Sequence, residues 1–184
     1  VLAVRAASSS RDPAASRRMA GVSEFDDATH VNPDGVGQII DGWDINGNAN
    51  GGYLLALAAR HLRAVSGRPD PVSITGHYLA PGKPGPMQVD ASVVKAGRRF
   101  ATVSGQMHAA GRPLLQLVGA FGDLSQPGSG YEHLASGPPE LPPFAACVPR
   151  SRRQGQVEVA MMDRLEVRIH PDHAGWVHND RNGV

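Results

Sequence analysis

The stretch that decides the fold reads Asn46-Gly-Asn-Ala-Asn-Gly-Gly-Tyr-Leu-Leu-Ala-Leu-Ala-Ala-Arg-His-Leu-Arg-Ala-Val65. Within it, Tyr53 to Ala59 are seven consecutive apolar residues. Seven consecutive positions cover every face of a helix with a period of 3.6 residues. We therefore predict one helix of about four turns, surrounded by the rest of the domain.

Both ends of this helix carry local signals. Asn50 is a favourable N-cap residue, and Arg60 and Arg63 fall in the last turn, where the helix dipole favours cations. Gly67 and Pro69 follow and end the helix.

Two glycines, Gly51 and Gly52, open the helix. A helix start leaves backbone N–H groups unpaired, and glycines let an anion or a polarised carbonyl approach those donors closely. The pair is therefore a candidate oxyanion hole. The alternative is that both glycines only allow a tight turn between a strand and a buried helix. The glycines alone leave both interpretations open.

Strands are predicted on both sides of the helix. A short helical or turn segment is expected from Ser23, followed by one strand. After the helix, runs with a two-residue period alternate with glycine-centred turns, which is typical of antiparallel hairpins. The predicted strands are near Gly37 to Ile45, Val72 to Leu79, Met87 to Lys95, Phe100 to Ala109, and Pro113 to Gly122. One helix and this many strands predict an α+β fold in which a curled antiparallel sheet wraps around the helix.

Composition narrows the function classes. Eighteen basic and seventeen acidic residues give no global field that would attract nucleic acid or an acidic membrane. No apolar run is long enough to span a bilayer. Cys147 is the only cysteine, so an internal disulfide is excluded and a reducing, cytoplasmic location is expected. The histidines of the tail, with Asp172, lack metal-ligand spacing, so no metal is predicted.

The chain divides into four predicted segments. Residues 1–21 are expected to be a disordered extension, with Met19 a plausible functional start, and residues 22–123 form the domain. Residues 124–160 are rich in proline and glycine and are predicted to be a linker. Residues 161–184 begin a further unit, because Asp163 to His170 alternates as a strand does.

The order of these features resembles the acyl-CoA thioesterase family of double hot-dog proteins, the bacterial type II medium-chain thioesterases and their relatives. The resemblance covers residues 35–122 and rests on five short stretches: Asn50 to Tyr53, Thr75 to Gly82, Lys95 to Thr102, Gly111 to Pro113, and Ala120 to Gly122. It implies a hot-dog domain at 22–123 and the start of an incomplete second hot-dog at 161–184.

The resemblance also implies a function. The substrate would be a fatty acyl-CoA thioester, hydrolysed by water without a cofactor, in fatty acid metabolism. The family's catalytic Asp, Thr and Gln lie in the second hot-dog, at positions that this sequence does not contain. The chain is therefore expected to form a homodimer or to bind a partner that supplies the second hot-dog. The alternative is a non-catalytic acyl-binding or assembly module; a dehydratase of the same fold would require a His and Asp pair facing the substrate.

Nine residues form the predicted site. The predicted catalytic groups are Asn50, Gly51, Gly52, Thr75 and His77; the predicted substrate-binding groups are Tyr53, Tyr78, Arg98 and Arg99. Each has a simpler alternative: Asn50 as a helix cap, His77 as a surface strand histidine, and the arginines as a solvated hairpin turn.

Free sheet edges are the reason to expect assembly. Val72 to Leu79 and Phe100 to Ala109 are rich in β-forming residues and are predicted to be edge strands. Pairing of such an edge with a second chain would satisfy its backbone hydrogen-bonding groups.

Overall fold

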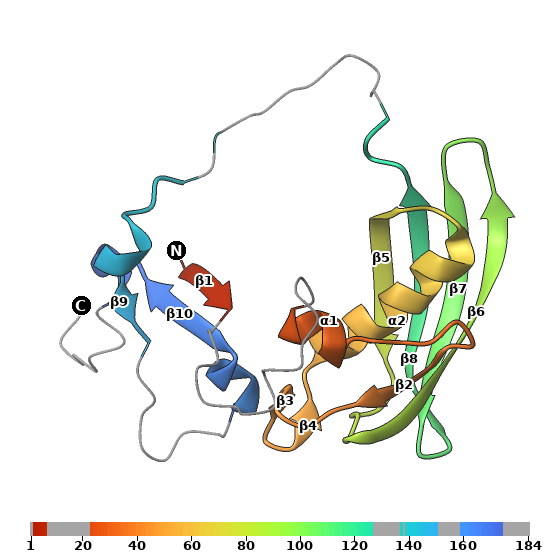
Figure 1. The fold of residues 1–184 in the computed structure, drawn as a ribbon, viewed down its shortest axis with the longest axis horizontal. Coiled ribbons are helices and arrows are strands. Elements are labelled where there is room, and N and C mark those ends of the chain that lie inside the picture. Colours follow the sequence, from red (N-terminus) through yellow and green to blue (C-terminus); the bar gives the residue numbers. More distant parts are fainter. Residues whose placement is uncertain (1, 7–22, 127–136, 138, 151–158, 175–184) are drawn as a thin grey trace.

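Helix α2 (Gly51–Ser66) lies across the concave face of a five-stranded antiparallel sheet (Figure 1). The computed structural model describes residues 2–6, 23–126, 137, 139–150 and 159–174. The strands of the large sheet are, in spatial order, β2 (Val36–Ile39), β6 (Gly85–Ala96), β7 (Ala101–Ala109), β8 (Arg112–Gly122) and β5 (Asp70–Tyr78). The predicted α+β arrangement is confirmed.

The local signals at the ends of α2 act as predicted. The Asn50 side-chain oxygen accepts hydrogen bonds from the backbone N–H groups of Gly52 at 2.9 Å and Tyr53 at 3.2 Å. Gly67 ends the helix in the left-handed conformation, with φ of 62°. No residue of the apolar run 53–59 is exposed, but Leu55, Ala56 and Ala59 are only half-buried.

The sheet side of α2 forms the core of the domain. Leu54, Leu57 and Leu62 are fully buried against the sheet. At Gly105 the helix approaches the backbone of β7 so closely that a Cβ atom would lie 2.7 Å from Leu62 Cδ1 and 3.0 Å from the carbonyl oxygen of Asp90. The absence of a side chain at Gly105 therefore sets the depth at which α2 packs.

The predicted hairpins are present, but one predicted edge is wrong. The turn between β7 and β8 has positive φ at both central residues, Ala110 (50°) and Gly111 (74°), as a type I′ turn requires. Strand β5 pairs with β8 and is an edge of the sheet, as expected. Strand β7, which corresponds to the predicted strand Phe100 to Ala109, is central because β6 and β8 pair with its two sides.

The segment before α2 contains two short strands where the sequence predicted one. The single strand expected from Gly37 to Ile45 is two strands in different sheets, β2 and β3 (Asp44–Ile45), because the chain turns at Gly42, where φ is 84°. The short helix expected near Ser23 is α1 (Glu24–Ala28). Between α1 and α2 lies the buried Trp43, whose ring stacks on Tyr53 with centroids 5.6 Å apart.

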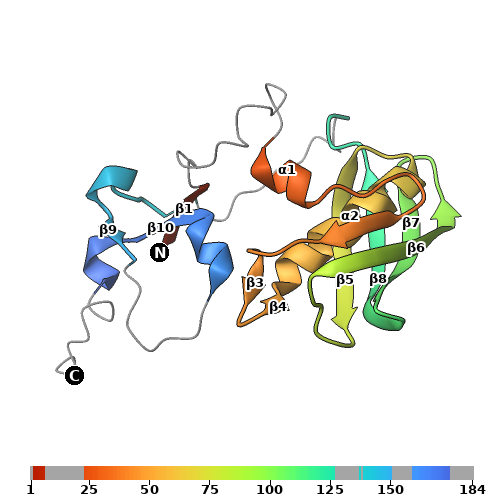
Figure 2. The same cartoon turned by 60° about the horizontal axis from the view of Figure 1, so that its bottom comes forward.

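A second, three-stranded sheet approaches β3 through the short 3-10 helix η3 (Ala160–Asp163) (Figure 2). It contains β1 (Leu2–Ala6), β10 (Leu165–Ile169) and β9 (Val148–Pro149) in that order, all antiparallel. The prediction of disorder is wrong for Leu2–Ala6, because these residues pair with β10; residues 1 and 7–21 lie outside the described part of the chain. Strand β10 confirms the predicted alternating strand.

The predicted linker contains ordered structure where the chain is described. Short 3-10 helices lie before β9 (η2, Phe144–Ala146) and on either side of β10 (η3, Ala160–Asp163; η4, Pro171–His173). Cys147 follows η2 and is buried, with 2% of its surface exposed.

Arg164 connects the two sheets. Its Nε donates to the carbonyl oxygen of Gly42 at 2.9 Å, and its guanidinium forms an ion pair with Glu24. The same guanidinium lies over the Trp43 ring, 5.3 Å from the centroid. The small sheet is thereby attached to the segment that leads into α2. Within the described residues, no helix is both long and apolar enough to cross a bilayer.

Candidate functional site

The N-terminus of α2 is held by a small hairpin and by the loop after β5. Strands β3 and β4 (Asn48–Ala49) form the hairpin. The Asn50 N–H donates to the carbonyl oxygen of Trp43 at 2.8 Å, and the Ala49 N–H donates to that of Gly82 at 3.0 Å. These backbone contacts fix the direction in which the first helical N–H groups point.

One amide of the first turn is left available. The Asn50 side chain already accepts from the N–H groups of Gly52 and Tyr53. Among the described residues, the Gly51 N–H donates to no protein group. The candidate oxyanion donor is therefore Gly51, and Gly52 serves the cap instead.

Tyr78, from the end of β5, packs directly on Gly51. Its hydroxyl donates to the Gly51 carbonyl oxygen at 2.8 Å, and a Cβ atom on Gly51 would lie 3.1 Å from the tyrosine ring. Tyr78 is 53% exposed, so this corner is open to solvent. An unpaired N–H at the positive end of a helix dipole, beside a phenol, can stabilise negative charge that develops on a carbonyl oxygen.

Thr75 and His77 lie on the other face of the sheet. Gly76 faces α2, because a Cβ atom there would lie 3.3 Å from Leu55 Cδ1. Successive residues of a strand point to opposite faces, so Thr75 and His77 point away from the helix. The structure does not bring these two predicted groups to Gly51.

Tyr53 lies in the core. It is 2% exposed, its hydroxyl donates to the carbonyl oxygen of Ala28 at 2.8 Å, and it accepts from the N–H of Ile40 at 3.2 Å. Burial raises the pKa of the Tyr53 phenol. This environment gives the residue a structural role, connecting α2 to the segments on either side of β2.

Arg98 and Arg99 lie at the far end of α2. They line an open cavity of about 720 Å³ with Phe100 and Asp123, beside Arg68, whose guanidinium donates to the carbonyl oxygen of Gly97 at 2.9 Å. Arg68 follows the C-terminus of α2, and a sixteen-residue helix is roughly 24 Å long. Hydrogen bonds from Ser125 and Gln126 hold the pKa of the Asp123 carboxyl below its usual value, so this cavity also contains an anion.

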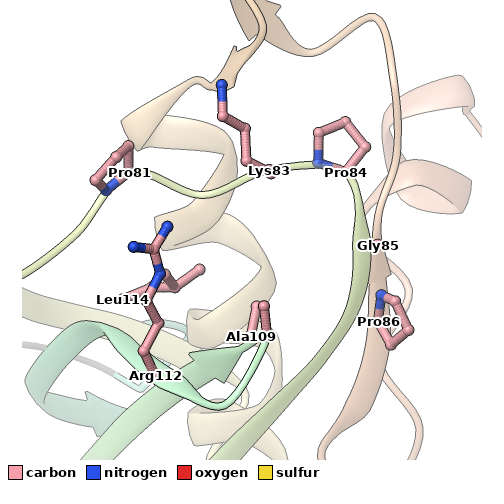
Figure 3. Close-up of a pocket in the computed structure, with 9 residues that line it drawn as sticks. Pro81, Lys83, Pro84, Gly85, Pro86, Ala109, Arg112 and Leu114 are labelled. Atoms are coloured by element: carbon pink, nitrogen blue, oxygen red, sulfur yellow. The ribbon is translucent and has the colours of Figure 1, made fainter.

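Sequence reasoning overlooked a second cavity, near the N-terminus of α2. Its volume is about 370 Å³, and two cations, Lys83 and Arg112, line it (Figure 3). A signal was present in the sequence, because each cation stands between a glycine and a proline, in Gly82-Lys83-Pro84 and Gly111-Arg112-Pro113. Of the tail histidines, His170 and His173 lie at η4, and His178 lies outside the described residues.

Part of the chain is similar to a known protein family. Residues 39–122 match the family model of the acyl-CoA thioesterase N-terminal domain. The crystal structure of a candidate thioesterase II from Thermobifida fusca superposes with a TM-score of 0.76 over 91% of this chain, at 26% sequence identity. The chain spans 62% of the length of that protein.

A second structure shows the same fold. A conserved protein of unknown function with a hot-dog fold, from Alicyclobacillus acidocaldarius, superposes with a TM-score of 0.66 at 22% identity, over 77% of this chain and 53% of its own. No curated protein matched the sequence. Residues 39–122 are thus similar to the acyl-CoA thioesterase N-terminal domain, and the sheet order and the helix in its concave face are those of a hot-dog fold.

Proposed function

We propose that this domain binds fatty acyl-CoA thioesters with the thioester carbonyl at the N-terminus of α2. The observation that carries the proposal is the Gly51 N–H, which has no protein acceptor among the described residues and belongs to a residue in contact with the half-exposed Tyr78. The match of residues 39–122 to an acyl-CoA thioesterase domain supports the choice of substrate.

Hydrolysis at this position requires no covalent protein nucleophile. Water attacks the carbonyl carbon, the oxyanion accepts a hydrogen bond from the Gly51 N–H, and the C–S bond breaks to release the acid and the thiol of CoA. The water must also lose a proton to a base. The family's catalytic Asp, Thr and Gln are implied to lie in a second hot-dog, so we expect this chain alone to bind acyl-CoA and to hydrolyse it weakly.

A non-catalytic acyl-binding module is the second candidate. The orientation of Thr75 and His77 favours it, because these two proposed water-activating groups face away from the N-terminus of α2. Measurable binding with no turnover would identify this function.

The partner that we propose is a second hot-dog, from another copy of the chain or from a different chain. It would pair along β5, one of the two edges of the large sheet. Such a partner could also supply the catalytic Asp, Thr and Gln that the resemblance places in a second hot-dog.

The test is to remove the Gly51 N–H alone. Gly51 is the first residue of α2, where proline is well tolerated, and Asn50 has a φ of −59° and a ψ of 137°, which suits a residue before proline. Gly51→Pro removes the donor, and Gly51→Ala is the matched control, because both substitutions place a Cβ atom against Tyr78. We expect Gly51→Pro to bind acyl-CoA about two- to tenfold more weakly than Gly51→Ala, as the loss of one hydrogen bond predicts.

Calorimetry across acyl lengths measures binding, and a thiol-release assay measures hydrolysis. Any turnover by the parent should fall by a factor of about 10² or more in Gly51→Pro relative to Gly51→Ala. Equal binding and turnover in the two variants would show that the carbonyl lies elsewhere. Absence of binding at every chain length would refute the acyl-CoA assignment.

A further inference from the structure

The cavity near the N-terminus of α2 lies between two loops of the large sheet. One wall is the loop between β5 and β6, with Pro81 and Pro84, and the other is the hairpin between β7 and β8. Leu114 and Ala109 form the apolar part of the lining (Figure 3). The cavity of about 370 Å³ is within the size range of small-molecule sites.

The charges around this cavity have one sign. Lys83 and Arg112 line it, and none of its lining residues is acidic. The Lys83 ammonium donates to the carbonyl oxygen of Gly47 at 2.8 Å, which leaves two of its three N–H groups for other acceptors. Among the described residues, the Arg112 guanidinium has no hydrogen-bond or ion-pair partner. Asp44 does not line the cavity, and its carboxylate accepts from the N–H groups of Gly42 and Gly47.

Both cations are held by constrained backbone, Lys83 in the loop between β5 and β6 and Arg112 at the start of β8. Proline fixes φ at positions 81, 84 and 86. Arg112 directly follows the tight turn at Ala110 and Gly111. Little backbone entropy is therefore lost when these loops bind a ligand.

The cavity is also at the proposed thioester end of α2. The Lys83 ammonium contacts Gly47, and Gly47 is four residues before Gly51. Four residues of fully extended chain span at most about 14 Å. A ligand whose carbonyl lies at Gly51 can thus reach Lys83 with a flexible arm of moderate length.

We propose that Lys83 and Arg112 bind phosphate groups of the CoA portion of the substrate. The inference rests on the proposed function and names the residues that hold the anionic end of the same ligand. Phosphate oxygens accept bidentate hydrogen bonds from guanidinium, and the ammonium adds a second positive charge. Arg98 and Arg99, the cations predicted from the sequence, are less suited, because they lie beyond the C-terminus of α2 beside the Asp123 carboxylate.

The experiment compares ligands that differ in phosphate content. Acyl-CoA, acyl-dephospho-CoA, acyl-pantetheine and inorganic phosphate are titrated calorimetrically into the parent, Arg112→Gln and Lys83→Gln. Arg99→Gln is the matched control, because it removes a cation from the other cavity. We expect Arg112→Gln and Lys83→Gln each to weaken acyl-CoA binding about tenfold, to leave acyl-pantetheine binding unchanged, and to reduce the salt dependence of acyl-CoA binding. Arg99→Gln should behave as the parent.

The outcomes separate this inference from the proposed function. If acyl-pantetheine binds the parent and acyl-CoA binding is insensitive to Arg112 and Lys83, the phosphate site is refuted and the proposed function stands. If acyl-pantetheine does not bind the parent but acyl-CoA binds and Arg112→Gln weakens that binding, the phosphate site stands and the thioester site fails. If Arg112→Gln and Lys83→Gln weaken acyl-pantetheine binding as much as they weaken acyl-CoA binding, the substitutions act on the structure and the assignment is refuted. Tight binding of inorganic phosphate that displaces no acyl-CoA would also overturn it.

Discussion

Two tyrosines near the N-terminus of α2, Tyr53 on the helix and Tyr78 at the end of β5, have hydroxyl groups in opposite environments. Tyr53 is buried, with its hydroxyl hydrogen-bonded to Ala28 and Ile40, whereas Tyr78 is half exposed and donates to Gly51. We expect Tyr53→Phe to lower the free energy of unfolding by about 1–3 kcal/mol, because it leaves two buried backbone groups unpaired. Tyr78→Phe should cost about 0.5–1 kcal/mol, because water replaces the lost contact. Urea denaturation measures both.

Each of the two variants serves as the control for the other, because each loses one hydroxyl and keeps the aromatic ring. Equal losses, or a larger loss for Tyr78→Phe, would contradict the core position of Tyr53. Acyl-CoA titration of the same variants checks the functional distinction, because only Tyr78 lies at the proposed carbonyl position.

At the scale of elements, α2 is covered more completely on one side than on the other. Leu57 is fully buried against the sheet, and Leu55 is half-buried beside β5. Leu57→Ala should therefore destabilise the domain by about 2–5 kcal/mol through the cavity that it leaves. Leu55→Ala should cost clearly less, because part of that side chain is already in contact with water.

Chemical denaturation of the two variants measures this difference. The substitutions are chemically identical and lie two positions apart on one helix, so helix propensity cancels between them. If Leu55→Ala proved as costly as Leu57→Ala, the half-buried side of α2 would be covered in solution, which points to assembly.

At the scale of the whole molecule, β5 is an exposed nine-residue edge. We expect the parent to sediment as a dimer at micromolar concentration. The double substitution Thr75→Lys, His77→Lys should shift it to the monomer, because charged side chains on an edge strand oppose pairing. Ser104→Lys is the control, since Ser104 lies on the same face of the sheet but on the central strand β7, where Ser92 of β6 and Val118 of β8 pair with it. A parent that remains monomeric on sedimentation would contradict the proposed pairing.

Local features of this fold were predictable from the sequence. Asn50 and Gly67 act on neighbouring backbone groups, so the ends of α2 could be predicted from adjacent residues alone. The glycine-centred hairpin turns are similarly local. The alternation of β5 was also predictable, and it places Thr75 and His77 on the opposite face of the strand from Gly76.

The features that the sequence did not predict depend on distant contacts. Strand β7 became central because β6 and β8 both pair with it. The face of β5 that covers α2 is decided by its register with β8, and periodicity alone does not specify it. Lys83 and Arg112 line one cavity only because the loop between β5 and β6 and the hairpin between β7 and β8 lie at the same end of the sheet. Strand β1 forms because a distant strand, β10, pairs with it.

The buried thiol of Cys147 can report on local opening of the structure. It is the only cysteine of the sequence, and it lies between η2 and β9, next to the small sheet and outside the domain around α2. The rate at which a thiol reagent labels this protein therefore measures the opening of the small sheet, separately from the unfolding of the domain around α2. An assay that detects released CoA with such a reagent will also detect the Cys147 thiol. One equivalent of thiol per chain, which reacts at the rate of that opening, must therefore be subtracted from the signal.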